Sequence, residues 1–127
     1  MAEPVASRDA ATPASIEELQ ARLRAFARAR DWGQFHTPKN LAMALVAEAG
    51  ELVEQFQWLT EKQSAELDAE KLAAVRHELA DVLIYLARLA DVLGVDLLAA
   101  AADKLALNEE RYPVDRVRGS ARKYDDY

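Results

Sequence analysis

Two short acidic motifs inside apolar helical stripes limit the possible folds of this chain more than any other feature. The motifs occupy residues 48–51 (EAGE) and 78–81 (ELAD), and each places two carboxylates three residues apart on one helix face. Glu48 falls in the apolar stripe of its segment, and Glu78 lies in line with the neighbouring valines of its own. An unpaired charge in a core-facing stripe is costly, so this placement needs a chemical explanation.

The rest of the chain indicates an all-α fold in one domain. Its 127 residues suit a single domain with a core, only four glycines and four prolines interrupt it, and no stretch alternates like a strand. Capping residues predict four helices, with a turn or a single helical turn at residues 60–68. They should run from Ser15 to residues 31–33, from Thr37 to about Trp58, from Asp68 to about Leu93, and from Asp96 to about Arg111.

The two ends of the chain differ in composition from the helical part. Residues 1–14 lack periodicity and are expected to be a disordered tail, which leaves residues 15–112 as the helical domain. Residues 113–127 form a basic segment that either contacts phosphates or is a solvated tail.

Composition excludes several classes of function. The chain has no cysteine, so it can form neither a disulfide nor a thiolate metal site. Its start does not resemble a signal peptide and no apolar run has transmembrane length, so we expect a cytoplasmic protein without a membrane partner. A net charge of −6 argues against general nucleic-acid binding, but divalent cations can bridge an acidic protein to a polyphosphate.

The four carboxylates of the two motifs, called here the acidic quartet, are Glu48, Glu51, Glu78 and Asp81. Carboxylates at this spacing lie roughly 5–6 Å apart, and each pair repels by about 3 kcal/mol at an effective dielectric near 20. None of the four has a Lys or Arg three or four residues away. They must therefore be protonated, pair with basic residues elsewhere, or bind a hard divalent cation.

Equal spacing on adjacent antiparallel helices favours the cation. Since no His lies at ligand spacing, Mg²⁺ or Mn²⁺ is the expected ion. The alternatives are a structural network of paired acids, or two helices that only expose acidic residues to solvent, which their position in the apolar stripe argues against.

Two further groups of residues have both an ordinary and a functional interpretation. Trp32, Phe35 and His36 stand in one short loop, either as a plug over the core or as a stack for a flat ligand such as a nucleobase. Lys104 and Asn108 lie four residues apart on one helix face. With Tyr112, four residues further on, they form a row of side chains, called here the ladder. This row is either exposed to solvent or binds a ligand.

Together these motifs resemble the MazG-like superfamily of all-α nucleoside triphosphate pyrophosphohydrolases, and within it the dCTP pyrophosphatase branch. The resemblance covers roughly residues 15–124. The matching segments are residues 32–41 (WGQFHTPKNL), 50–58 (GELVEQFQW), 81–86 (DVLIYL), 111–113 (RYP) and 119–124 (GSARKY).

The resemblance implies a four-helix subunit that assembles as a dimer or a dimer of dimers, with sites at subunit interfaces. It implies hydrolysis of a nucleoside triphosphate between the α- and β-phosphates, with the acidic quartet as Mg²⁺ ligands. Glu48 or Glu51 is then the expected base for the attacking water. The resemblance also implies the substrate-binding residues. The base would be flanked by Trp32 and Trp58, with His36 nearby, and the sugar and phosphates would be held by Tyr85, Lys104, Asn108 and Tyr112.

Two rival functions remain open. A di-iron carboxylate bundle needs Glu-x-x-His motifs, and neither histidine follows a glutamate at that spacing. A non-catalytic helical dimerisation or regulatory module would use its apolar faces as interface and the acidic quartet as a structural metal or acid cluster.

Overall fold

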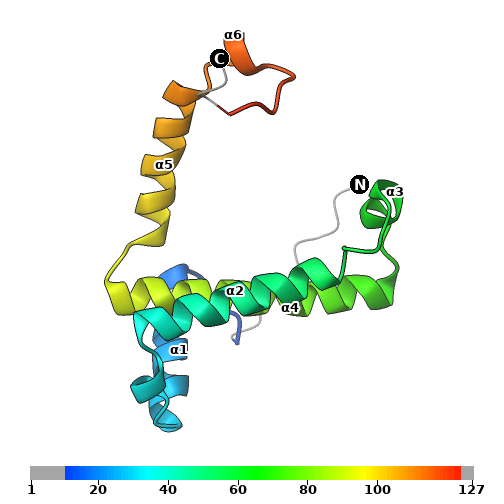
Figure 1. The fold of residues 1–127 in the computed structure, drawn as a ribbon. Helices are drawn as coiled ribbons and strands as arrows, with labels where there is room; N and C mark the ends of the chain where they lie inside the picture. The colour runs from blue at the N-terminus through cyan, green and yellow to red at the C-terminus, as the bar shows by residue number, and fades with distance from the viewer. Residues whose placement is uncertain (1–10, 124–127) are drawn as a thin grey trace. The chain divides into compact units, whose positions relative to one another are not determined.

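Residues 11–123 are described in the structure, a computed structural model, and they form helices and connecting turns without a strand (Figure 1). Residues 1–10 of the predicted tail lie outside the described part. The elements are α1 (Ile16–Ala29), the 3-10 helix η1 (Gly33–Phe35), α2 (Pro38–Glu54), α3 (Glu61–Ala65), α4 (Ala69–Leu93), α5 (Leu97–Arg111) and α6 (Val114–Val117).

The predicted helix starts are confirmed, because each predicted cap makes its hydrogen bond. The side chain of Asp68 accepts from the backbone N–H of Lys71 at 2.7 Å. The corresponding acceptors at the other three starts are the side chains of Ser15, Thr37 and Asp96. Gly94 ends α4 in the left-handed conformation, with φ 68°, as predicted for a glycine at a helix C-terminus.

The predicted end of the second helix is wrong. We expected it near Trp58, but α2 ends at Glu54. Beyond that residue the chain forms a tighter turn, since the N–H of Phe56 donates to the carbonyl of Val53, three residues earlier, at 2.9 Å. Thr60 must adopt an extended conformation to cap α3, so the chain has to leave the α2 axis before it.

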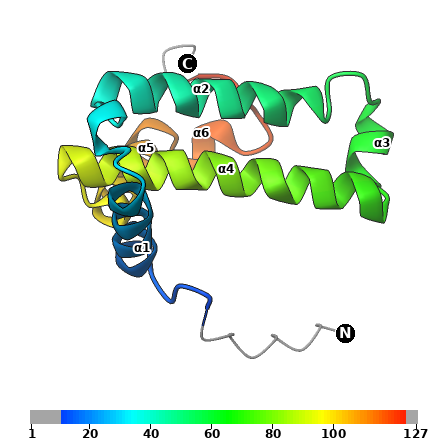
Figure 2. The same ribbon diagram turned by 90° about the horizontal axis from the view of Figure 1, so that it is seen from below.

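The chain divides into two compact units, Met1–Gly94 and Val95–Tyr127. In the first unit α2 and α4 run antiparallel and lie side by side in both views, and α1 packs against α4 (Figures 1 and 2). Among the described residues, the buried apolar side chains are few and mostly small: Ala27, Leu41, Val75, Ala87 and Ala90. The core of this unit therefore lies along the contact of α4 with α1 and α2.

The second unit contains α5 and α6. Helix α5 ends at Arg111 just before Pro113, as predicted, and Tyr112 donates its N–H to the carbonyl of Asn108 at 2.8 Å. Pro113 is the N-cap residue of α6, a single helical turn inside the basic C-terminal segment. None of the helices that the structure describes is both long enough and apolar enough to cross a bilayer.

Large apolar side chains remain exposed on α2 and α4. Leu72 is 55% exposed and Leu79 is 53% exposed, although both belong to the apolar stripe of α4. On α2 the exposed apolar side chains are Met43, Val46 and Val53. The stripes are thus wider than the contact between the two helices requires.

A candidate metal centre beside an aromatic pocket

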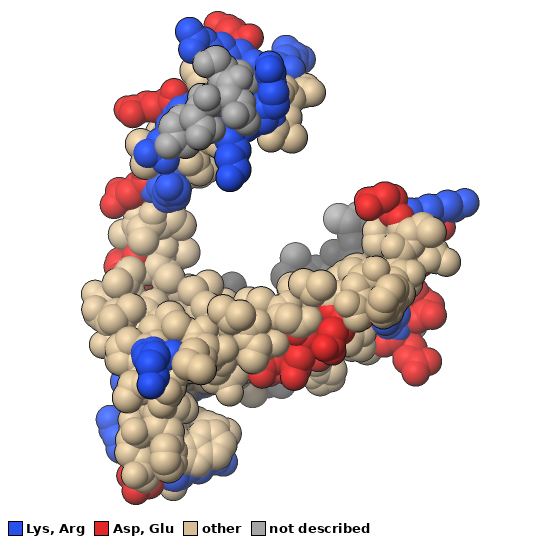
Figure 3. Space-filling view, in the orientation of Figure 1, with Lys and Arg blue, Asp and Glu red and all other residues tan. Residues whose placement is uncertain are grey.

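The acidic quartet converges where α2 and α4 face each other. One oxygen from each of Glu48, Glu51, Glu78 and Asp81 lies within 4.8 Å of the other three. The antiparallel arrangement of the two helices accounts for this, because it sets one carboxylate pair opposite the other. Acidic side chains gather on the face formed by these helices in Figure 3. The predicted convergence of the quartet is therefore confirmed.

The acidic quartet contains polar atoms that need a partner. Glu51 is exposed, whereas the other three side chains are half-buried. Oε2 of Glu48 and Oε2 of Glu78 are buried and have no hydrogen-bond partner. Within residues 11–123, no lysine or arginine forms an ion pair with any of the four. An all-oxygen donor set with orphaned buried oxygens fits a hard divalent cation.

Crowding of the carboxylates changes their protonation. Desolvation, followed by the neighbouring carboxyl group of Glu51, raises the pKa of Glu48 to about 7. Desolvation also raises the pKa of Glu78, with the charge of Glu51 as the next cause. A bound dication would act in the opposite direction and favour the ionised form of Glu48.

A cavity of about 260 Å³, called here the aromatic pocket, adjoins the acidic quartet through Asp81, which borders both. Its apolar walls come from α1 and α4, and its aromatic walls come partly from the segment between α1 and α2. The lining residues are Leu23, Phe26, Trp32, His36, Asp81, Ile84, Tyr85 and Arg88. The structure therefore brings together three predicted substrate-binding residues, namely Trp32, His36 and Tyr85.

The end of α1 explains how Trp32 reaches the aromatic pocket. The helix ends at Ala29, slightly before the predicted residues 31–33, and Asp31 follows with φ 52°. The N–H of Trp32 donates to the carbonyl of Ala27, five residues earlier, at 2.9 Å, and the N–H of Asp31 donates to the carbonyl of Arg28 at 3.2 Å, which together form a Schellman motif. This motif favours an apolar contact back onto the last turn, and the rings of Trp32 and Phe26 lie 5.7 Å apart at 69°.

His36 follows η1 and completes this aromatic group. Its ring lies 6.3 Å from that of Trp32 at an interplanar angle of 60°. Nε of Arg88 donates to Nδ1 of His36 at 3.1 Å. Burial, and then the charge of Arg88, lowers the pKa of His36, so the imidazole is neutral at neutral pH.

Sequence reasoning missed Arg88 as a residue of this site. A signal was available, because Asp81, Tyr85 and Arg88 are spaced by four and three residues and so share one face of α4. The sequence pattern indicates Phe26 only as an apolar position of the first helix, although its ring also lines the aromatic pocket. The guanidinium of Arg30 stacks on the same ring, with its Cζ 3.6 Å from the ring centroid.

The remaining predicted substrate-binding residues are not gathered at the aromatic pocket. Trp58 lies in the turn after α2, is 86% exposed, and does not line the pocket. Lys104 and Asn108 belong to α5 and Tyr112 caps it, so all three are in the second unit. Their roles stay predictions.

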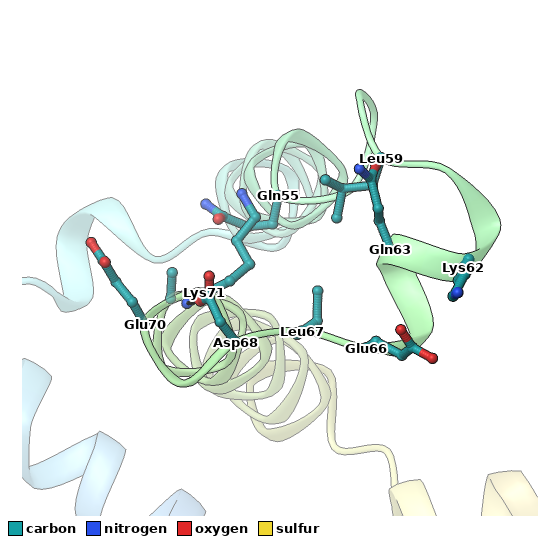
Figure 4. A pocket seen from close by; sticks show the side chains of 10 residues that line it. Gln55, Leu59, Lys62, Gln63, Glu66, Leu67, Asp68, Glu70 and Lys71 are labelled. Carbon is teal, nitrogen blue, oxygen red and sulfur yellow. Dashed lines mark hydrogen bonds between the residues drawn. The ribbon is translucent and has the colours of Figure 1, made fainter.

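A larger cavity of about 650 Å³ lies between the end of α2, α3 and the start of α4 (Figure 4). It mixes both charges, with Lys62 and Lys71 beside Glu66 and Glu70. It contains no predicted site residue, and Asp68 at its edge already accepts the N–H of Lys71 as the cap of α4. This cavity is larger than the aromatic pocket, but its side chains do not suggest a ligand. The acidic quartet and the aromatic pocket are therefore the candidate site.

Comparisons with known proteins find pyrophosphatases among the relatives of this chain. The dCTP pyrophosphatase 1 of Mus musculus is 47% identical over 114 residues, which are 88% of this chain and 67% of the mouse protein. The dCTP pyrophosphatase 1 of Homo sapiens is 44% identical over the same length and shares of the chains. The crystal structure of a pyrophosphatase from Archaeoglobus fulgidus superposes with a TM-score of 0.73 at 41% identity, over 77% of this chain and 92% of that one.

A sequence model of the MazG-like family matches residues 43–127, which include the acidic quartet. This match and the identity to curated relatives confirm the resemblance drawn from the motifs. The chain belongs to the MazG-like family.

Proposed function

We propose that this protein is a nucleoside triphosphate pyrophosphohydrolase that acts on dCTP or a modified dCTP. It hydrolyses the bond between the α- and β-phosphates and releases a nucleoside monophosphate and pyrophosphate. The observation that carries the proposal is the position of Asp81, which belongs to the acidic quartet and also borders the aromatic pocket. The names of the curated relatives and of the solved pyrophosphatase support the reaction and the substrate.

The residues of the acidic quartet would hold Mg²⁺, or Mn²⁺ in its place, through carboxylate oxygens alone. When bound, the cation neutralises polyphosphate charge and polarises the phosphoryl oxygens. The buried, unpartnered oxygens of Glu48 and Glu78 support this assignment, because an ion would satisfy both.

The carboxylates also provide the base that the reaction needs. Water attacks the α-phosphorus while Glu48 or Glu51 takes up its proton, and the bond to the bridging oxygen breaks as pyrophosphate leaves. A group with a pKa near the working pH is suited to this exchange, and the pKa of Glu48 is about 7 before a cation binds.

The aromatic pocket would bind the base. Trp32, His36 and Tyr85 line it, and aromatic rings offer stacking surfaces to a nucleobase. Trp58 would flank the base from outside this pocket. Lys104, Asn108 and Tyr112 would contact sugar and phosphates, with Lys104 as a point charge toward phosphate oxygens. These four roles rest on the family resemblance.

A panel of nucleotides with direct detection of pyrophosphate tests the proposal. We expect dCTP and 5-methyl-dCTP to yield pyrophosphate with Mg²⁺, with kcat/KM on the order of 10- to 100-fold above that for dATP. Removal of the cation by a chelator should stop turnover, and added Mg²⁺ or Mn²⁺ should restore it. Equal kcat/KM for dCTP and dATP would contradict the base preference. No pyrophosphate from any nucleotide would favour the non-catalytic dimerisation module.

We further propose that the subunits, as four-helix bundles, assemble as a dimer or a dimer of dimers. The exposed leucines of α4 and the exposed apolar residues of α2 support this, because they are contiguous helix faces that favour burial. Sedimentation velocity at micromolar concentration should show a species of two or four chains. A stable and active monomer would overturn the assembly. Cytoplasmic location and the absence of nucleic-acid and membrane partners remain predictions from the sequence.

A further inference from the structure

A line of charged groups connects α1 to the wall of the aromatic pocket. Nη1 of Arg24 on α1 lies 2.6 Å from Oδ1 of Asp91 on α4. The other oxygen of Asp91 lies 3.4 Å from Nη1 of Arg88, one turn earlier on α4. Nε of Arg88 then donates to Nδ1 of His36 at 3.1 Å. None of these residues belongs to the acidic quartet, so the line is a separate feature of the site.

The line is shielded from solvent at its centre. The side chains of Arg88 and Asp91 are 13% and 17% exposed, whereas Arg24 at the outer end is 45% exposed. Asp91 compensates the charge of Arg88 and holds one arm of the guanidinium, which keeps Nε available for His36. Such a partly buried, charge-assisted pair is worth more than a surface ion pair of the same length.

The hydrogen bond to His36 determines which ring nitrogen carries the proton. A guanidinium does not deprotonate in proteins and only donates, so Nδ1 of His36 must accept. A neutral imidazole that accepts at Nδ1 carries its proton on Nε2. The ring is neutral because burial, and then the charge of Arg88, lowers the pKa of His36.

We propose that Arg88 is a positioning residue that fixes His36 as the Nε2-protonated tautomer, so that His36 presents a donor to an acceptor atom of the bound base. The second half of this inference rests on the proposed function. Cytosine carries adjacent acceptors at O2 and N3, which suit such a donor. A purely structural clip between α1, the loop and α4 is the alternative, and it would make no demand on the tautomer.

The tautomer can be measured without activity. The chain has two histidines, and His77 on α4 is exposed, so it serves as an internal reference in the same spectrum. In the full-length protein with ¹⁵N-labelled imidazoles at pH 7.5, we expect widely separated ring-nitrogen shifts for His36, with Nδ1 unprotonated. His77 should show shifts averaged over tautomers. A protonated Nδ1 or averaged shifts at His36 in the unmodified chain would overturn the proposal, whatever the behaviour of any variant.

The matched variants are Arg88→Met and Arg76→Met, since both arginines are on α4 and Arg76 is exposed. Arg88→Met keeps an unbranched apolar stem in the pocket wall but removes the donor. We expect it to bring the two nitrogen shifts of His36 together, whereas Arg76→Met leaves them apart. Circular dichroism checks the fold. An unchanged His36 spectrum in folded Arg88→Met would show that other groups fix the tautomer and would refute the role of Arg88.

Kinetics test whether His36 donates to the bound base. Arg88→Met should raise KM for dCTP by about 5- to 10-fold and leave kcat within about threefold, because a donor to the base acts on binding and not on the phosphoryl group. Arg76→Met should change neither. An unchanged KM in Arg88→Met would refute the donor role. Absence of turnover in the unmodified enzyme would contradict the proposed function instead, and the spectrum would still decide the tautomer.

Discussion

The Glu48→Gln variant should lose nearly all pyrophosphate release from dCTP, with kcat lower by on the order of 10³-fold or more. Glutamine keeps the shape of the side chain but removes one anionic oxygen from the acidic quartet and one of the two candidate bases. The measurement is pyrophosphate release at saturating dCTP and Mg²⁺. Glu70→Gln, an exposed carboxylate of α4 outside the quartet, should retain full activity. Full activity in Glu48→Gln would refute the assignment of the site.

The same variant should be more stable than the unmodified protein when no cation is present. Four carboxylates with oxygens within 4.8 Å of one another repel, and Glu48→Gln removes part of that repulsion. After allowance for solvent screening, we expect the free energy of unfolding to rise by roughly 1 kcal/mol above pH 7. A loss of activity together with a gain in stability would separate a functional role of Glu48 from a structural one.

The pH dependence of stability follows from the raised pKa of Glu48. In the unfolded chain this carboxyl titrates near its ordinary 4.5, and in the folded chain near about 7. Between these pH values the folded state binds more protons, so stability falls as pH rises. Urea unfolding with a chelator at pH 5 and pH 8 should show this fall, and Glu48→Gln should reduce it. An identical fall in both proteins would mean that Glu48 is not its source.

Trp32→Ala should raise KM for dCTP by about 5- to 150-fold, which is the usual effect of removing one aromatic stacking partner of a base. The ring also contacts Phe26 and lies edge-on to His36, so its loss opens a wall of the aromatic pocket. Discrimination between dCTP and dATP should weaken at the same time. Steady-state kinetics with both nucleotides give the two quantities.

Two variants of the same loop control for this effect. Trp32→Phe keeps an aromatic ring and should recover most of the affinity. Phe35→Ala removes a neighbouring aromatic side chain that is 59% exposed and does not line the aromatic pocket, so its KM should not change. A Trp32→Ala enzyme with unchanged KM would favour the alternative in which the loop only covers the core.

Features that depend on local chemistry could be predicted from the sequence. The helix starts at Thr37 and Asp68 follow from a side chain bonding an N–H a few residues away, and both are present. The convergence of Glu48 with Glu78 also follows, because helical period and antiparallel pairing determine it. Each of these inferences needs only neighbouring residues or the pairing of two helices.

Features that depend on tertiary contacts could not be predicted. Arg88 contacts His36 only because the loop after α1 folds back onto α4, across 52 residues of sequence. The early end of α2 depends on the path that the chain takes to cap α3. The ladder of Lys104 and Asn108 belongs to the second unit, and its relation to the acidic quartet stays a prediction.

In the proposed function, Asp81 lies between the base in the aromatic pocket and the phosphates at the acidic quartet, because it borders both features. The distance from the base to the α-phosphorus is then fixed, so the site would select substrates by their length. A nucleotide whose base sits one atom deeper would move its α-phosphorus away from the attacking water. Selection against wrong bases can therefore operate through the reach of the substrate, even where the pocket admits them.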